Sequence, residues 1–384
     1  MRIGFLLNHD QIHQAAHVVP VAAALARLRP ELDLVLATGS DAMDAEARRL
    51  LALLGSSVPV TRLRLHRPFG RVAARMLDPL LPAGKLLLYR DNLPFFRSLD
   101  ALVVPEKTSA ILRTRYGLRN LRLIHTRHGA GDRAIGFNRT SAAFDRVLVA
   151  GPKIRDRLVR DAGVAPDRIA VVGYPKFDLP AGADVRALFA DPDKPLVLYN
   201  PHPSPRLSSW YRDGRAVLDH FRRDRSRNLV FAPHAMLFRR SFALSVDPPA
   251  LARPGRVARR FRDAPNILVD PGSVRSTDMS YTAAADLYLG DVSSQIYEFL
   301  RTPRPCVFID SHRTAWRDDP SYRHWQAGEV IEGAAGLGAA LDRAFAAPDR
   351  YRAAQEALFA ATFDITAEPS ADRAARAVLA VLEE

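Results

Sequence analysis

Short apolar runs alternate with amphipathic segments along the whole chain. The runs have the length of buried strands, whereas most segments between them place apolar residues at the i, i+3, i+4 spacing of one helix face. Such alternation is typical of parallel sheets covered by helices on both faces, so the sequence predicts an α/β fold. The expected strands are 2–7, 32–38, 101–104, 122–126, 146–151, 169–173, 196–200, 228–233, 266–270, 286–290 and 305–309.

The chain divides near residues 173–195, which are rich in Pro, Gly and Asp, and its 384 residues are long enough for two domains. We expect one α/β domain over 1–180, a second over 190–365, and a helix over 366–384 that packs back across both. Ligands of such sheets bind outside the carboxyl ends of the strands, so two facing domains would form a central cleft. The expected helices include 17–29, 41–54, 153–162 and 370–382.

The charge balance is basic: 55 Lys and Arg against 42 Asp and Glu give a net charge of +13. Such a surface attracts nucleotides, anionic polymers or an acidic membrane face, although a solvated arginine-rich surface explains it equally well. The single cysteine, Cys306, excludes an internal disulfide and a cysteine-based zinc site. No window approaches the ~18 apolar residues of a membrane span, and the apolar N-terminal run is too short for a signal peptide. We expect a cytoplasmic protein, with possible peripheral contact to the inner membrane face.

The stretch GDVSS (290–294) joins an expected strand to an expected helix. The free backbone N–H groups of a first helical turn, with the hydroxyls of Ser293 and Ser294, form an anion site of the kind that holds phosphates. Gly290 permits a tight turn, and we expect Asp291 to cap the turn or to select a protonated or hydroxyl partner. Ser293 acting simply as an N-cap is the alternative interpretation.

Histidines follow several of the expected strands. His128 precedes a glycine-rich loop in IHTRHGAGDRAIGFN (124–138), where it is a candidate proton acceptor, and Arg133 adds a cation. A structural role for a lone histidine after a strand is the alternative. His202 and His234 each follow a strand and a proline, with Arg206 and Arg239 shortly after them, and their convergence would form a cationic pocket for a pyrophosphate.

Other motifs carry less information. His9, His13 and His17 are spaced by four, but no nearby cluster completes a metal site, so we expect an acceptor-binding loop or plain surface there and no metal. There is no Walker loop and no nucleophile elbow. Basic and aromatic residues do not interleave as in single-strand binders, so no nucleic-acid partner is expected.

Seven stretches together resemble, in order, the CDP-glycerol glycerophosphotransferase family, the enzymes of teichoic-acid-type polymers. The resemblance covers roughly residues 100–380, and its most specific parts are the His-Gly motif and the Asp-Val-Ser-Ser element. Here Val292 replaces an aromatic residue, Ala235 replaces a proline, and His202 stands where the family more often has threonine. The stretches are HTRHG (125–129), VLVAGPKIRDRL (147–158), VVGYPKFD (171–178), PLVLYNPH (195–202), LVFAPH (229–234), LYLGDVSSQIYEFL (287–300) and PCVFID (305–310).

The resemblance implies a GT-B architecture of two Rossmann-like domains, with the nucleotide held by the second. It implies a general base at His128, a phosphate-side histidine at His234, and donor phosphates held by Ser293 and Ser294. We expect Asp291, His202 and Arg206 beside those phosphates. The nucleoside or ribose would contact Glu298, Tyr174 and Pro175, and the acceptor side would include His9, His13 and Arg133.

The expected activity is transfer of a polyol phosphate, glycerol phosphate above all, from a CDP-activated donor to an acceptor hydroxyl, with release of CMP and no cofactor. The acceptor would be linked to a lipid or a glycan. A sugar transferase or epimerase of the same fold is the first alternative, with Glu298 contacting the donor ribose or sugar. A non-catalytic binder of anionic polymers is the second, and it would need its arginines but not its histidines.

Overall fold

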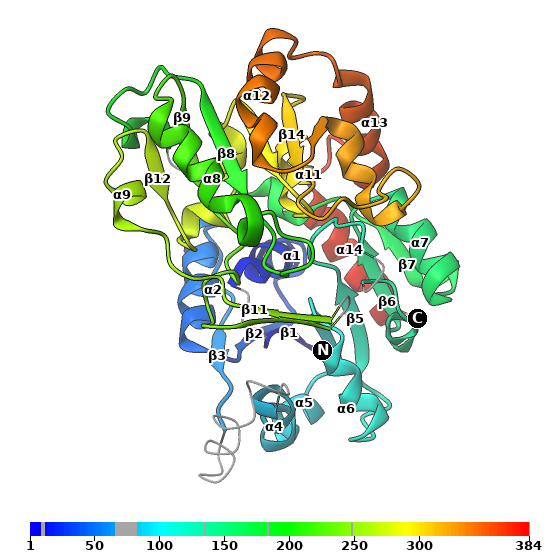
Figure 1. Cartoon of the computed structure of the whole chain (residues 1–384). Coiled ribbons are helices and arrows are strands. Elements are labelled where there is room, and N and C mark those ends of the chain that lie inside the picture. The colour runs from blue at the N-terminus through cyan, green and yellow to red at the C-terminus, as the bar shows by residue number, and fades with distance from the viewer. Residues whose placement is uncertain are drawn as a thin grey trace. The chain divides into compact units, whose positions relative to one another are not determined.

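The computed structural model describes residues 1–8, 12–65, 83–133, 136–180, 182, 184–246 and 249–383. The chain forms two compact units, each built on one parallel sheet (Figure 1). Unit 1 comprises Met1–His128, Phe137–Pro180 and Ala360–Glu384, and unit 2 comprises Gly129–Gly136 and Ala181–Phe359. The short segment Gly129–Gly136 therefore belongs by its contacts to unit 2, although it follows a strand of unit 1.

The sheet of unit 1 has seven parallel strands in the order β3-β2-β1-β4-β5-β6-β7. Its central strands are buried along nearly their whole length, which explains why they read as continuous apolar runs rather than as alternating ones. The strands are β1 (Arg2–Leu7), β2 (Asp33–Thr38), β3 (Val60–Arg62), β4 (Ala101–Val104), β5 (Arg122–Thr126), β6 (Arg146–Val149) and β7 (Ile169–Val171).

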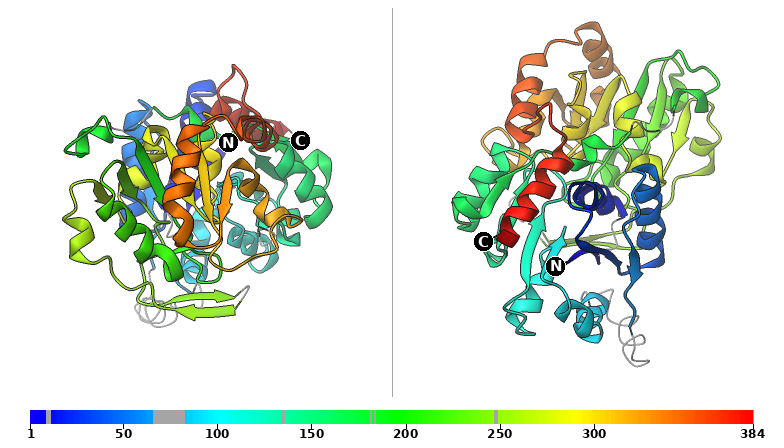
Figure 2. Two further views of the ribbon diagram at one scale, coloured as in Figure 1. Left: turned by 45° about the horizontal axis from the view of Figure 1, so that its top comes forward. Right: turned by 180° about the vertical axis from the view of Figure 1, so that it is seen from behind.

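Helices cover both faces of this sheet (Figure 1, Figure 2). One apolar core joins the sheet to α1 (Ala15–Leu28), α2 (Asp41–Leu53) and α14 (Ser370–Glu383). A second core, on the opposite face, includes side chains of α4 (Ala83–Asp91), α5 (Leu93–Arg97), α6 (Ile111–Thr114) and α7 (Pro152–Ala162). Local sequence sets the helix ends: Ser40 caps α2 by accepting from the Met43 N–H, and α7 ends at Gly163 with a left-handed φ of 64°.

The sheet of unit 2 has six parallel strands in the order β12-β9-β8-β13-β14-β15. A separate antiparallel pair, β10 (Ala243–Val246) and β11 (Pro249–Ala252), forms a hairpin. The sheet strands are β8 (Leu196–Asn200), β9 (Asn228–Phe231), β12 (Ile267–Val269), β13 (Leu287–Gly290), β14 (Cys306–Ile309) and β15 (Glu329–Ile331).

One face of the unit 2 sheet shares an apolar core with α8 (Trp210–Arg223), α9 (Arg259–Arg262) and α12 (Leu337–Ala346). On the other face Tyr288 of β13 packs against Phe299 of α11 (Gln295–Phe299), with ring centroids 5.5 Å apart. The short α10 (Ser280–Ala284) lies beside α11. The last helix of this region, α13 (Arg352–Thr362), contains the boundary between the two units.

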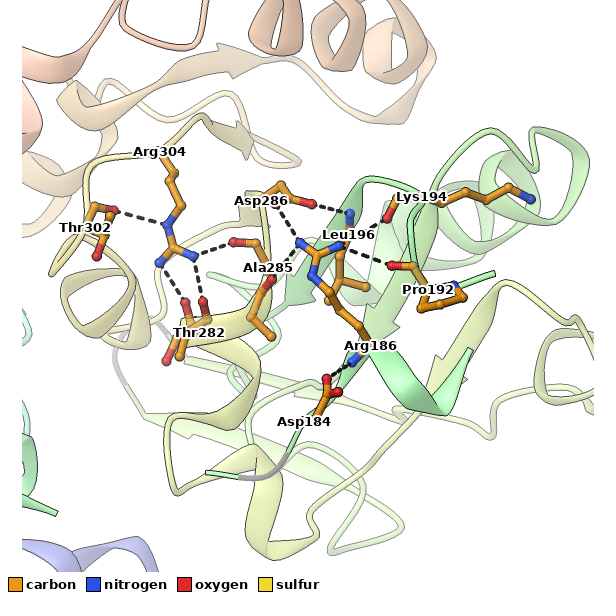
Figure 3. Close-up of polar contacts among 12 residues, drawn as sticks. Asp184, Arg186, Pro192, Lys194, Leu196, Thr282, Ala285, Asp286, Thr302 and Arg304 are labelled. Carbon is orange, nitrogen blue, oxygen red and sulfur yellow. Dashed lines mark hydrogen bonds and ion pairs between the residues drawn. The ribbon is translucent and has the colours of Figure 1, made fainter. Parts of the chain in front are cut away.

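Two arginines fix the ends of these short helices, as Figure 3 shows. The Arg304 guanidinium donates to the carbonyls of Thr282 and Ala285 at the end of α10, and to that of Phe299 at the end of α11. The Arg186 guanidinium donates to the carbonyl of Ala284, the last residue of α10, and to the Asp286 carboxylate just before β13. Cations at helix C-termini satisfy carbonyls that have no partner inside the helix, so these arginines hold the strand–helix element in place.

The predicted α/β fold of two parallel-sheet domains is confirmed, and each expected strand is present within a few residues of its expected bounds. The prediction missed β3 and β15, which have three residues each, and the hairpin β10–β11. Within the described part of the chain, no helix has the length and apolar character needed to cross a membrane.

Candidate functional site

In unit 1, His128 lies two residues beyond β5 with both ring nitrogens engaged. Its Nδ1 lies 2.7 Å from the Pro105 carbonyl oxygen, and its Nε2 lies 3.1 Å from the amide nitrogen of Gln14. A carbonyl oxygen only accepts, so Nδ1 carries the proton and donates it to Pro105. Gln14 then donates its N–H to the lone pair on Nε2. The ring is held in the tautomer whose Nε2 can accept a proton.

The surroundings of His128 keep it neutral. Burial lowers the pKa of His128 to about 4, the neighbouring cations Arg127, Lys107 and Lys85 lower it further, and the Pro105 hydrogen bond opposes the shift. Burial, together with Arg127, also lowers the pKa of Lys107 to about 8. The ring of His13 lies 6.2 Å from that of His128, centroid to centroid. Unit 1 thus presents a neutral imidazole beside positive charge.

In unit 2, Asp291 at the end of β13 anchors the surrounding loops. Its buried carboxylate accepts from the backbone N–H groups of His202 (2.8 Å), Ser209 (2.6 Å) and Val292 (2.6 Å). The Ser209 hydroxyl adds a fourth bond at 2.8 Å. Burial raises the pKa of Asp291 to about 6, although these hydrogen bonds act in the opposite direction. The carboxylate is saturated by donors of the protein, so it orders this edge of the sheet.

His202 and His234 follow β8 and β9, which are neighbours in the sheet. Nδ1 of His202 accepts from the Ser204 N–H at 3.0 Å, and Nδ1 of His234 accepts from the Met236 N–H at 3.2 Å. Burial lowers the pKa of His234 to about 4, and burial and nearby cations lower that of His202. Each neutral ring therefore carries its proton on Nε2. The two rings, 6.1 Å apart, are hydrogen-bond donors at Nε2.

The first glycines of the segment Gly129–Gly136 pack next to the start of α11. Gly129 has a φ of +74°, which favours glycine, and a Cβ on Gly131 would lie 3.2 Å from the Cβ of Ser294. Ser294 is exposed, whereas Ser293 is 1% exposed and its hydroxyl oxygen lies 3.4 Å from the Gln295 N–H. Of the two serines, Ser294 alone presents its side chain at the surface, beside a backbone where a side chain on Gly131 would crowd it.

A buried polar network holds this segment within unit 2. The Asp132 carboxylate accepts from the Tyr297 hydroxyl and lies 3.3 Å from Nδ1 of His324. Nε2 of His324 and Nε1 of Trp325 donate to the Asp291 carbonyl at 3.0 and 2.8 Å. Sequence reasoning singled out none of Asp132, Tyr297, His324 and Trp325, because their partners lie far away in the chain.

The remaining predicted site residues lie in different surroundings. Arg133 lies in unit 2, where its charge is one of the causes that lower the pKa of His202, and its predicted place on the acceptor side stays a prediction. Arg206 is exposed, and Glu298 is half-buried on α11. His9 lies outside the described residues. Among the residues that are described, no group of three or more His, Cys, Asp or Glu side chains could hold a metal ion.

Tyr174 and Pro175 are buried inside unit 1. The Tyr174 ring lies 4.8 Å from the ring of His17, 4.7 Å from that of Phe177 and 4.8 Å from that of Phe363. This aromatic cluster accounts for the burial of Tyr174. The predicted contact of these two residues with a nucleoside stays a prediction.

Comparison with known proteins identifies the architecture. No protein-family model matches the chain, and no curated protein matches it either. Among solved structures it is similar to the wall teichoic acid polymerase TagF with CDPG (TM-score 0.64, 13% identity, 99% of this chain and 89% of that chain). It is also similar to UDP-GlcNAc 2-epimerase from Neisseria meningitidis bound to UDP-GlcNAc (TM-score 0.60, 11% identity, all of both chains). A third match is S. aureus MnaA with UDP (TM-score 0.61, 11% identity, 100% of this chain and 96% of that chain). At these identities the likeness shows the fold, which is GT-B.

Proposed function

We propose that this protein is a transferase that moves a polyol phosphate, glycerol phosphate above all, from a CDP-activated donor to an acceptor hydroxyl. The observation that carries the proposal is the pair of opposite histidine tautomers. In unit 1, His128 offers a proton-accepting nitrogen. In unit 2, His202 and His234 offer N–H donors at the carboxyl ends of neighbouring strands. Transfer of a phosphate group to a hydroxyl needs one group that accepts the proton of the hydroxyl and another that donates hydrogen bonds to the phosphate oxygens.

In the proposed step, the acceptor hydroxyl takes the place of the Gln14 amide at Nε2 of His128. Its oxygen attacks the phosphorus distal to the nucleoside while its proton passes to Nε2. The bond from that phosphorus to the bridging oxygen breaks, and CMP leaves with the electron pair. The products are the phosphodiester of the acceptor, CMP and one proton held by His128.

On the donor side, the proposal assigns the pyrophosphate to unit 2. The Nε2–H groups of His202 and His234, the Ser294 hydroxyl and the Arg133 guanidinium are donors that suit phosphate oxygens. Fixed donors of this kind commonly contribute roughly 3–4 kcal/mol to the transition state for one well-aimed group. His128 immediately precedes Gly129, the first residue of the segment whose Gly131 approaches Ser294.

A nucleotide-sugar enzyme is the second candidate, because UDP-GlcNAc 2-epimerases, one of them bound to UDP-GlcNAc, share the fold to a similar degree. The two candidates differ in the nucleoside of the donor. The polyol-phosphate transferase requires cytidine, whereas an enzyme like these epimerases requires uridine.

The deciding experiment is a thermal-shift titration with CDP-glycerol, CDP, CMP, UDP and UDP-GlcNAc. A ligand at 100 times its dissociation constant stabilises the folded state by about 2.7 kcal/mol, which shifts the melting temperature by several degrees. Stabilisation by CDP-glycerol and CDP, but not by the uridine compounds, is the expected result. Stabilisation by UDP-GlcNAc alone would replace the proposal with the second candidate, and no shift with any compound would contradict both.

A further inference from the structure

The hairpin β10–β11 exposes large apolar side chains on one face. Leu244 pairs with Leu251 across the two strands, and they are 69% and 67% exposed. Because alternate residues of a strand share a face, Phe242 lies on the same side as Leu244, and it is 46% exposed. Ser245, on the opposite side, is buried. We call Phe242, Leu244 and Leu251 the apolar hairpin face; the hairpin itself is the antiparallel pair of arrows in Figure 2.

The sequence on either side of the apolar hairpin face is rich in positive charge. Residues 239–262 contain seven arginines and one acidic residue, Asp247, a net charge of 7 − 1 = +6 in a chain whose total is +13. All seven arginines are exposed. The Arg253 guanidinium lies over the Phe242 ring, 4.6 Å from its centroid. The seven are Arg239, Arg240, Arg253, Arg256, Arg259, Arg260 and Arg262.

This combination differs from an ordinary exposed surface. Single exposed leucines are common in folded proteins, but a cross-strand pair of them beside a phenylalanine leaves a contiguous apolar patch in water. A protein partner would require matching acidic side chains in one fixed arrangement. An anionic bilayer meets both features without such matching, because its surface charge is negative and its acyl boundary accepts apolar side chains.

We propose that the apolar hairpin face binds the surface of an anionic lipid bilayer. Leu244, Leu251 and Phe242 enter the boundary between headgroups and acyl chains, and Arg253 and Arg256 lie against the lipid phosphates. This inference goes beyond the proposed reaction and does not depend on it, since the binding requires neither donor nor acceptor.

The test is sedimentation of the full chain with vesicles of phosphatidylcholine alone and of phosphatidylcholine mixed with phosphatidylglycerol. We expect binding to the anionic vesicles, weakening as salt rises because exposed charges are screened. The double variant Leu244→Asn/Leu251→Asn should lose at least about tenfold in partition coefficient. The double variant Arg253→Gln/Arg256→Gln should lose binding to the anionic vesicles, and the binding that remains should depend less on salt.

Matched controls lie elsewhere in unit 2. Leu188 is exposed outside the hairpin, and Arg215 is exposed on α8, so Leu188→Asn and Arg215→Gln should bind as the unchanged chain does. Equal binding by the double leucine variant, or no binding of the unchanged chain to anionic vesicles, would overturn the proposal. Self-association that the leucine variant abolishes, without vesicle binding, would assign the face to a second copy instead.

Discussion

The histidines of the two units differ in one contact that decides their chemistry. In unit 1 the Nδ1 of His128 faces a carbonyl oxygen, whereas in unit 2 the Nδ1 of His202 and that of His234 each face a backbone N–H. All three follow parallel strands, and burial lowers the pKa of each, so strand position and charge do not distinguish them. The backbone partner does: it leaves an acceptor at Nε2 of His128 and a donor at Nε2 of the others.

The same substitution should therefore have opposite consequences in the two units. Glutamine places an amide near the position of the histidine Nε2, where it can donate a hydrogen bond but cannot accept a proton. We expect His128→Gln to lower turnover by roughly 10²–10⁴-fold with donor binding nearly unchanged. His234→Gln keeps an N–H donor and should stay within about tenfold of the unchanged chain. The measurement is CMP release from CDP-glycerol, with the donor dissociation constant determined in parallel.

His220, half-buried on α8, provides the control, and His220→Gln should leave turnover unchanged. If His128→Gln and His234→Gln lowered turnover equally, the contrast between the two units would fail. Unchanged turnover in His128→Gln would remove the base from the proposed mechanism.

The role of Asp291 as the anchoring carboxylate of unit 2 can be tested by its effect on the free energy of unfolding. In Asp291→Asn, an amide N–H group would face donors that now point at a carboxylate oxygen, leaving buried N–H groups without partners. We expect a loss of about 2–4 kcal/mol in the free energy of unfolding, measured by urea denaturation. Asp193→Asn, at an exposed position, should change it by less than ~0.5 kcal/mol. Equal stability of the two variants would mean that the Asp291 network is not an anchor.

A smaller effect is expected where the glycine-rich segment is held. Tyr297→Phe removes the hydroxyl that donates to Asp132 but keeps the aromatic ring. The contact between His324 and Asp132 is also kept. We expect a loss of about 1 kcal/mol, with KM for the donor rising more than kcat falls, since the segment next to Ser294 loosens. Tyr211→Phe, which removes a hydroxyl bonded to the Pro203 carbonyl, is the matched control for loss of one hydrogen bond. A fall in kcat alone would contradict a positioning role for Tyr297.

The pH profile tests the environment of His128. The proposed base must be unprotonated, and its pKa is lowered from 6.5 to about 4, so activity should persist as pH falls from 7 through 6.5 and fall only toward pH 4. The acid limb of kcat/KM, which reports the free enzyme, is the quantity to measure. An acid limb at the ordinary histidine value would show that the imidazole is not in the desolvated, cationic surroundings described for unit 1.

Because burial lowers the pKa of these histidines, the free energy of unfolding also depends on pH. For His128 and His234 the folded pKa lies below the unfolded value, so protons bind first to the unfolded chain. Their contribution to the free energy of unfolding is fully present above about pH 6.5 and is lost as pH falls from there toward about 4. Thermal unfolding between pH 7 and pH 5 should show this decline, and replacing His234 by Gln should reduce it.

The fold could be predicted from hydrophobic periodicity because each strand or helix leaves its pattern in a short stretch of the sequence. Each buried strand is an apolar run, and the helices α1, α2, α7 and α14 carry an apolar stripe, so both features are visible in short windows. Strands β3 and β15 have only three residues and leave no such pattern. The histidines after β5, β8 and β9 were found for the same reason, since each lies within three residues of the end of an apolar strand.

The parts of the site that the sequence could not predict depend on distant contacts. Gln14 and His128 are 114 residues apart, and His324 lies 192 residues from Asp132. Nothing local distinguishes Ser293, which is buried, from Ser294, which is exposed. The tautomers could not be predicted either, because they depend on whether a carbonyl or an N–H group of the folded backbone faces Nδ1.

The most direct test of the account is a long-range ¹H–¹⁵N correlation spectrum of the histidine side chains, assigned with single His→Gln variants. The predicted result is a neutral His128 with its proton on Nδ1, and neutral His202 and His234 with their protons on Nε2, at pH 7. A proton on Nε2 of His128, or the same tautomer at all three residues, would contradict the division into one base and two donors.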